Sequence, residues 1–327
     1  MISRRHIVLG GAAGTAGAAL GLLPAGMAEA QAITSLQLFI PANPGGGWDA
    51  TGRAIELAMR TDKIIQSFQF EHKGGAGGTV GLPIFASTKK GLPNAVMVGG
   101  MVMVGAIIAN KSPVKLTDVA PLARLTGEFE VVVVPAASPF KTMKDLVAAF
   151  KADPAKVSWA GGSAGGTDHI LAAMIAKVAG VDPKKIAYVA HAGGGPAQAA
   201  LLGGHVSCGI SGWDEFAAQV KAGKLRALAI SSDKRQPGID VPTLKEQGID
   251  VELFNWRGVF GAPGTTADQQ KALIALFDRM VKGPTWTAEL AKRGWTGIYL
   301  SGAEFGKYIE SEVGRITATL KGLGLAT

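Results

Sequence analysis

Short apolar runs alternate with amphipathic segments along the chain from about residue 36 onward. Runs rich in Val, Ile, Leu and Phe predict strands, and segments with apolar positions three and four apart predict helices. The alternation is typical of a mostly parallel, doubly wound α/β architecture. The expected strands are 36–40, 68–71, 95–99, 131–134, 157–160, 186–189, 206–210, 225–230 and 251–254. The expected helices are 49–60, 142–151, 168–178, 196–202, 215–222, 267–281, 284–293 and 303–320.

The chain is longer than one hydrophobic core usually serves, which favours two lobes. Two segments are candidate crossings between the lobes: the valine run 131–134, which leads into a Pro- and Ala-rich stretch, and residues 254–259. We therefore predict that residues 31–134 and 256–327 form lobe one and that residues 135–255 form lobe two. Two antiparallel crossings make a hinge, which suits closure around a ligand.

The first 30 residues have the layout of an export signal. Arg4 and Arg5 precede an apolar, Gly- and Ala-rich stretch, and small residues follow around Ala28 and Ala30. Cleavage after Ala30 or after Ala32 fits this pattern, and residues 3–9 also fit a twin-arginine signal, so the export route stays open. No later window is apolar for 18 residues without interruption. We expect a secreted, periplasmic protein that is soluble after cleavage.

Charge and side-chain chemistry narrow the function further. The formal net charge of +8 favours anionic ligands, whereas the scattered Lys and Arg residues argue against nucleic acid as a partner. The single cysteine, Cys208, lies in an expected strand and is interpreted as a small apolar residue. No pair of histidines has a chelating spacing, and no nucleotide fingerprint is present. We therefore expect no metal and no cofactor.

Four glycine-rich turns each follow an expected strand and precede an expected helix. In α/β proteins these turns bind ligands, because glycine lets main-chain N–H groups converge on an oxyanion at a helix N-terminus. A single turn of this kind would be explained by packing alone, but two in each predicted lobe favour a site for a carboxylate. The turns are residues 44–49, 74–79, 161–167 and 192–196.

An enzyme needs a nucleophile and a base, and the candidates are few. Ser163 lies in a glycine-rich turn, but no Gly-x-Ser-x-Gly elbow surrounds it. His169 and His191 are the histidines near turns of the second lobe. We expect the protein not to be an enzyme, and a secreted hydrolase that uses Ser163 is the alternative that esterase assays would test.

The glycine turns resemble, in this order, those of the substrate-binding proteins of tripartite tricarboxylate transporters. The most specific element is Pro41 to Asp49 with Arg53 following, and it is particularly similar to the tricarboxylate-type branch. Residues 71–81 are similar to the second loop of the family, although His72, Lys73 and Gly74 stand where Asn, Arg and Pro are usual. Residues 162–169 and 191–206 are similar to the second-lobe elements.

The resemblance implies a two-lobed, Venus-flytrap fold, a citrate-like di- or tricarboxylate ligand, and membrane transporter subunits as partners. It also implies that main-chain amides and small hydroxyls hold the ligand. The alternative to a transport function is a sensory one, in which the same domain signals to a membrane sensor kinase. Trp213, after the expected strand 206–210, is a candidate wall of the pocket, with plain packing as its alternative. We expect a monomer. The implied ligand-binding residues are Gly46, Gly47, Trp48, Gly75, Ala76, Gly77, Gly78, Ser163, Ala164, Gly165, Gly166, Thr167, His191, Ala192, Gly193 and Gly194.

Asp49 and Arg53 follow the first glycine turn. A carboxylate beside a carboxylate ligand would be repulsive, so we expect Asp49 to cap its helix. Arg53, one turn further on, is expected either to offset that charge or to pair with Asp49.

Overall fold

The computed structural model describes residues 33–326, so the predicted export signal lies outside the described residues. These residues belong to one compact unit. Within the described range the strands join into a ten-stranded sheet in the order β2-β1-β3-β9-β4-β7-β5-β6, with β8 and β10 both pairing with β4. No helix in this range combines the length and the apolarity that a bilayer crossing requires.

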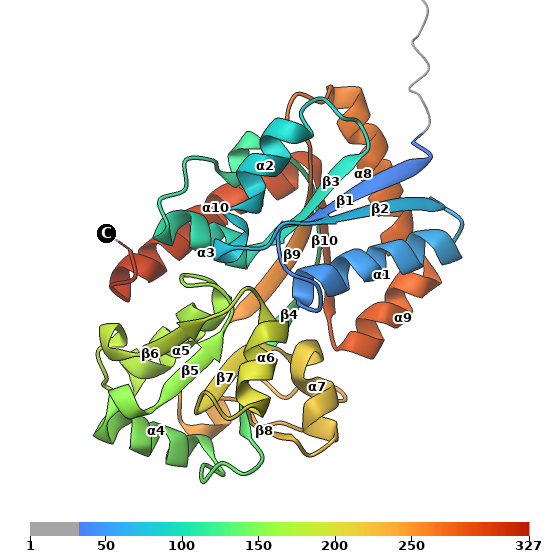
Figure 1. Cartoon of the computed structure of the whole chain (residues 1–327). Coiled ribbons are helices and arrows are strands. Elements are labelled where there is room, and N and C mark those ends of the chain that lie inside the picture. Colours follow the sequence, from blue (N-terminus) through green and yellow to red (C-terminus); the bar gives the residue numbers. More distant parts are fainter. Residues whose placement is uncertain (1–32, 327) are drawn as a thin grey trace, which may run out of the picture. The chain divides into compact units, whose positions relative to one another are not determined.

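The first lobe is built around β1, β2 and β3, which pair in parallel, and β9 and β4, which complete the sheet in antiparallel pairing (Figure 1). The elements up to the first crossing strand are β1 (Ser35–Ile40), α1 (Gly47–Thr61), β2 (Ser67–His72), η1 (Ala76–Gly78), α2 (Gly81–Thr88), β3 (Ala95–Gly100), α3 (Met101–Ala109), η2 (Leu116–Asp118) and β4 (Ala120–Pro135).

The second lobe is built around β6, β5 and β7, which are parallel, with β4 and β8 beside them. Its elements are α4 (Met143–Ala152), η3 (Pro154–Lys156), β5 (Ser158–Gly161), α5 (Thr167–Val178), η4 (Pro183–Lys185), β6 (Ala187–Ala190), α6 (Gly194–Leu202), β7 (Cys208–Gly212), α7 (Trp213–Lys221), β8 (Leu225–Ile230) and η5 (Lys245–Gln247).

The chain then returns to the first lobe, where its last helices pack against elements from the beginning of the chain. α9 contacts α1, α10 contacts α3, and α8 contacts β4. The returning elements are β9 (Phe254–Gly261), α8 (Ala267–Val281), α9 (Pro284–Arg293), β10 (Thr296–Ser301) and α10 (Gly302–Gly322).

Local sequence chemistry sets several of these helix boundaries. Thr142 and Asp145 form a reciprocal capping box at the start of α4, and Thr266 and Gln269 form another at the start of α8. α9 begins at Pro284, whose missing N–H costs nothing in a first turn, and it ends before a glycine in the left-handed conformation. These signals explain why the boundaries of α4, α8 and α9 lie within one residue of those that the sequence predicts.

Two long strands connect the lobes. Residues 120–129 of β4 pair antiparallel with β9, and residues 130–135 of β4 pair with β7 and β8. β4 therefore belongs to both sheets, and β9 lies antiparallel beside it where the chain returns. This arrangement confirms the predicted two-lobed α/β fold with two crossovers. The residue bounds of the lobes, 31–134 with 256–327 and 135–255, stay a prediction.

Some sequence expectations differ from the structure. The strand expected at 251–254 is wrong except for Phe254, because the strand begins there and continues to Gly261. The strand expected at 131–134 is only the last part of β4. α2, α3 and β10 were not expected. The interpretation of Cys208 is confirmed, since it is a buried free thiol in β7 whose pKa burial raises well above its usual value.

Candidate ligand-binding site

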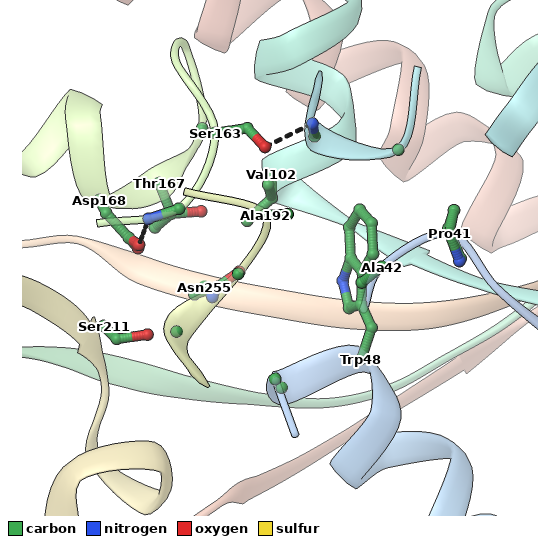
Figure 2. Close-up of a pocket in the computed structure, with 18 of the residues that line it drawn as sticks. Pro41, Ala42, Trp48, Val102, Ser163, Thr167, Asp168, Ala192, Ser211 and Asn255 are labelled. Atoms are coloured by element: carbon green, nitrogen blue, oxygen red, sulfur yellow. Dashed lines mark hydrogen bonds between the residues drawn. The ribbon is translucent and has the colours of Figure 1, made fainter. Parts of the chain in front are cut away.

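The glycine turns after β1, β2, β5 and β6 converge on one cavity that has walls from both lobes. Its empty volume is about 610 Å³, a figure that includes the open solvent at its mouth. Figure 2 shows Pro41 and Trp48 on one side of this space and Thr167, Asp168 and Ser211 on the other. The residues that line it are Pro41, Ala42, Gly46, Gly47, Trp48, Gly75, Gly77, Gly78, Val102, Gly162, Ser163, Gly166, Thr167, Asp168, Ala192, Gly193, Gly194, Ser211, Glu215, Asn255 and Arg257.

Three helices begin at this cavity. Their N-cap residues are Gly46 of α1, Gly166 of α5 and Gly193 of α6, and glycine has no side chain that could cap the helix. The first N–H groups of a helix have no partner within the helix, and the helix dipole places partial positive charge there. Three such ends at one cavity form a ready-made environment for an oxyanion.

The turn at η1 requires glycine for steric reasons. Gly77 and Gly78 both have positive φ, at 64° and 88°. A Cβ on Gly77 would overlap the Cβ of Ala106 in α3, and one on Gly78 would lie 2.5 Å from Cε of Met103. The turn is therefore pressed against α3, which leaves its main chain, rather than side chains, at the cavity.

Ser163 links the two lobes across the cavity. Its Oγ accepts a hydrogen bond from the main-chain N–H of Gly77 at 2.5 Å, although the two residues are 86 positions apart. Ser163 follows β5 in the second lobe, and Gly77 lies in η1 of the first lobe. Figure 2 marks this bond with a dashed line. A predicted site residue thus makes a direct contact between the lobes.

Two carboxyl groups line the inner part of the cavity. Asp168 accepts a hydrogen bond from the N–H of Gly162 at 2.5 Å, and Glu215 accepts one from the hydroxyl of Ser211. Burial raises the pKa of Asp168 to about 6 and that of Glu215 to about 8. Glu130 of β4 is fully buried, and burial and the carboxyl charges of Asp168 and Glu215 hold its pKa well above the usual range.

Arg257 of β9 is the one basic side chain among the residues that line the cavity, and it pairs with the buried carboxylate of Glu128. Burial lowers the pKa of Arg257 to about 9, which leaves the guanidinium charged at neutral pH. Its Nη1 has no hydrogen-bond partner within the described part of the protein, and the same is true of Oγ1 of Thr167 and Oδ1 of Asn255. These three polar atoms are buried at the cavity wall and are available to a ligand.

Most predicted site residues line this cavity: Gly46, Gly47, Trp48, Gly75, Gly77, Gly78, Ser163, Gly166, Thr167, Ala192, Gly193 and Gly194. Ala76, Ala164, Gly165, His191 and Trp213 do not line it. Trp213 packs in a hydrophobic cluster with Phe216 and Ile239, which is the packing alternative that the sequence left open. The glycine turns thus predict most of the wall, and their role in binding stays a prediction.

Several residues that line the cavity were not among those predicted from the sequence. Asp168 was interpreted as an acid in the first turn of a helix, and it does lie in the first turn of α5. Ser211 and Glu215 flank the turn where Trp213 was chosen, so their position was a signal that could have found them. Asn255 and Arg257 reach the cavity only because β9 pairs with β4, and no local pattern marks that. The wall residues not selected are Pro41, Ala42, Val102, Gly162, Asp168, Ser211, Glu215, Asn255 and Arg257.

At the start of α1 the predicted pairing of Arg53 with Asp49 is present, but Asp49 accepts no hydrogen bond from an N–H of the helix itself. Asp49 accepts a hydrogen bond from the N–H of Gly45 at 3.0 Å and one from His72, and Arg53 pairs with it at 3.5 Å. Burial opposes ionisation of Asp49, but these partners more than offset it and lower its pKa. Asp49 is therefore occupied by partners from the first glycine turn, from α1 and from β2. Among residues 33–326 no group of three or more His, Cys, Asp or Glu side chains is arranged to hold a metal ion.

Two lobes that are joined by two crossing strands and share a cavity at helix N-termini define a solute-binding protein. The model of the tripartite tricarboxylate transporter family receptor matches residues 52–325, and the chain belongs to this family. Its family and its structural relatives are receptors for solutes rather than enzymes.

Comparisons with individual proteins agree. A relative from Cupriavidus necator, described as a UPF0065 protein in the gbd 5' region, is 30% identical over 336 residues, which cover 99% of each chain. A solved structure of a periplasmic transporter has a TM-score of 0.81 at 25% identity, covering 89% of this chain and 98% of the other. MatC from Rhodopseudomonas palustris with bound malate has a TM-score of 0.76 at 21% identity, covering 88% of this chain and 98% of its own.

Proposed function

We propose that this protein is exported to the periplasm, captures a small carboxylate in the cavity between its lobes, and delivers it to the membrane subunits of a tripartite tricarboxylate transporter. The observation that carries the proposal is the meeting of three helix N-termini with glycine N-caps, at Gly46, Gly166 and Gly193, in one cavity. Such N–H clusters bind oxyanions, and a carboxylate is one of them.

The ligand is bound as a small anion that spans the two lobes. The cavity has walls from both lobes, and MatC, which shares the fold, holds malate. The citrate-like ligand and the monomeric state are the sequence predictions that this proposal keeps. Binding would hold the lobes together through contacts such as that of Ser163 with Gly77. The transporter subunits would then recognise the closed form of the protein.

The hydrolase alternative gains no support from the contacts of Ser163. Its Oγ accepts a hydrogen bond from a main-chain N–H, which is a structural role. His169 instead accepts a hydrogen bond from the N–H of Gly165 and stacks on Tyr188 with ring centroids 4.2 Å apart. Burial lowers the pKa of His169 to about 4, so it is a poor proton acceptor at neutral pH.

A thermal-shift screen followed by calorimetric titration tests the proposal. The panel contains citrate, tricarballylate, malate and succinate, with sugars as controls. A ligand at 100 times its Kd raises the free energy of unfolding by about 2.7 kcal/mol. We expect a rise in melting temperature with at least one carboxylate and none with sugars. A rise with sugars alone would overturn the ligand class and leave the solute-binding fold intact.

A further inference from the structure

The carboxyl group of Glu215 lies where two of the three helices at the cavity begin. Glu215 belongs to the first turn of α7 and lines the cavity. The N–H of Gly47, the first residue of α1, donates a hydrogen bond to this carboxyl group. A Cβ on Gly46 would lie 3.4 Å from its Oε1, and a Cβ on Gly194, the first residue of α6, would lie 2.5 Å from its Oε2. A protein carboxyl group therefore fills the space between the N-termini of α1 and α6, and we call this space the anion site.

The contact of Glu215 with the anion site joins the two lobes. α1 belongs to the first lobe, whereas α6 and α7 belong to the second. The glycine turns of the two lobes meet beside the carboxyl group, because a Cβ on Gly195 would lie 3.5 Å from the carbonyl oxygen of Gly45. A group that enters the anion site from solvent must therefore displace the Glu215 side chain or move the lobes apart.

The position of Glu215 is built into the fold. The Ser211 hydroxyl donates a hydrogen bond to its Oε2, and Nε2 of Gln198 in α6 donates one to its main-chain carbonyl at 2.6 Å. The preceding residue, Asp214, pairs with Arg293 of α9 at 3.5 Å. The first turn of α7 is thus held from both lobes, which directs the Glu215 carboxyl group to the anion site.

Glu215 and a ligand carboxylate require the same hydrogen-bond donors. The N–H groups in the first turn of a helix have no partner within the helix, and they bind an oxyanion instead. At the starts of α1 and α6 the groups that would receive a ligand carboxylate already face Glu215. The protein side chain and the ligand therefore exclude each other from the anion site.

An ionised ligand is able to win this competition at neutral pH. Burial and the carboxyl groups of Asp214 and Asp168 raise the pKa of Glu215 to about 8, so its side chain is largely uncharged at pH 7. Carboxyl groups in water ionise well below pH 7, and a ligand carboxylate arrives with its full negative charge. The partial positive charge at helix N-termini favours the ionised group over the neutral acid.

We propose that Glu215 is a built-in competitor of the ligand: it occupies the anion site in the ligand-free protein, and a ligand carboxylate binds there only by displacing it. The inference rests on the proposed function, because it takes a carboxylate ligand at the helix N-termini as given. It makes Glu215 a residue that sets the affinity of the protein by lowering it.

Calorimetric titration of Glu215→Ala with citrate, tricarballylate, malate and succinate tests this inference. Alanine suits a helix and leaves the anion site open. We expect each carboxylate that binds the natural protein to bind the variant at least fivefold tighter, the equivalent of one hydrogen bond. A carboxylate that binds only the variant would also support the inference. Equal or weaker binding to the variant would overturn the inference and leave the proposed function standing. Failure of all four at millimolar concentration with both proteins would overturn both.

Further variants separate occupancy of the anion site from a general effect on the fold. Glu215→Gln keeps an oxygen that accepts from the Gly47 N–H, so it should gain clearly less affinity than Glu215→Ala, and an equal gain would contradict occupancy as the cause. Glu310→Ala makes the same change at an exposed position of α10 and should leave all affinities unchanged. Glu215→Asp withdraws the carboxyl group by one methylene. It serves if Glu215→Ala does not fold, and it should also raise the affinity.

The main-chain amide signal of Gly47 gives an independent readout in ¹⁵N-labelled protein. Without ligand, Glu215→Ala should shift this signal, because the N–H loses its hydrogen-bond acceptor. With saturating carboxylate, the Gly47 signals of the natural protein and the variant should converge, because the ligand then occupies the anion site in both. An unchanged signal in the ligand-free variant would mean that Glu215 does not occupy the site. A difference as large at saturation as without ligand would mean that Glu215 is not displaced, and either result would overturn the inference.

Discussion

Arg257 of β9 and Glu128 of β4 form an ion pair where the two crossing strands lie antiparallel, and their side chains are 3% and 1% exposed. Glu128 is next to Phe129, the last residue of β4 that pairs with β9, and Arg257 faces the cavity. A Cβ on Gly47 would overlap the Arg257 guanidinium, so this side chain also fills the space beneath the start of α1. The pair thus connects the crossing strands to the first glycine turn.

Removal of one partner of this pair should destabilise the protein strongly. Arg257→Met leaves the Glu128 carboxylate buried without a cation, and such losses cost about 3–5 kcal/mol. The double variant Glu128→Gln with Arg257→Met removes both charges and should recover most of that loss. Urea denaturation at pH 7 measures the three free energies of unfolding. A double variant that is less stable than the single one would contradict the view that the lone charge is what destabilises.

Gly77→Ala should weaken ligand binding by tenfold or more. The new side chain needs positive φ and overlaps Ala106, so the turn that presents its main chain to the cavity must move. Gly91→Ala is the matched control, because Gly91 has φ of 75° and an added Cβ would meet nothing within 4 Å. Both variants should lose about 1 kcal/mol of stability from the strained backbone. Calorimetric titration should show normal ligand affinity only for Gly91→Ala. Equal ligand affinities of the two variants would contradict the assignment of the Gly77 turn to the site.

Ser163→Ala should weaken binding by about fivefold. It deletes the acceptor for the Gly77 N–H, and one hydrogen bond of this kind contributes about 1 kcal/mol. Ser87→Ala on α2 is the control, since that exposed hydroxyl donates only to carbonyls of its own helix. Titration with the best carboxylate measures both variants. Hydrolysis of ester substrates that disappears only in Ser163→Ala would instead support the hydrolase alternative.

The stability of the free protein should fall as pH rises from about 5 to 8. Burial raises the pKa of Glu215 to about 8 and that of Asp168 to about 6, so between the usual carboxyl pKa and these values the folded state binds more protons than the unfolded state. The contribution of these two groups to the free energy of unfolding is present at low pH. It is lost as pH rises through their raised pKa values. Thermal melts should show that Glu215→Gln flattens this decline by at least about 1 kcal/mol, the equivalent of one pKa unit. An unchanged pH profile in that variant would contradict the raised pKa.

The glycine turns could be predicted because their signals are local. Glycine between a strand and a helix implies a left-handed or close-packed turn, and Gly77 and Gly193 have φ of 64° and 118°. The same holds for Thr142 and Thr266, whose capping chemistry marks the start of a helix within a few residues. Trp213 shows the limit of local reasoning: the turn where it lies reaches the cavity, but the indole is directed into the hydrophobic cluster around Phe216.

The remaining differences between the predicted and the observed elements arise from contacts between distant parts of the chain. Residues 120–130 of β4 include Arg124 and Glu128 and lack a clear apolar run, yet pairing with β9 and β10 makes them a strand. Residues 95–109 are apolar throughout, so no period separates β3 from α3 at Gly100. The cluster of Glu130, Asp168 and Glu215 could not be predicted because the three residues come together only through the assembled second lobe.

The most direct test of the carboxylate site is a titration of ¹⁵N-labelled protein with the tightest-binding carboxylate, followed through the main-chain amide signals. We predict that the largest chemical-shift changes belong to the main-chain amides at the cavity, those of Gly47, Gly77, Thr167 and Gly194. These changes should saturate with the Kd that calorimetry gives. Shifts that cluster elsewhere, such as around the separate hollow lined by Trp213 and Arg226, would contradict it.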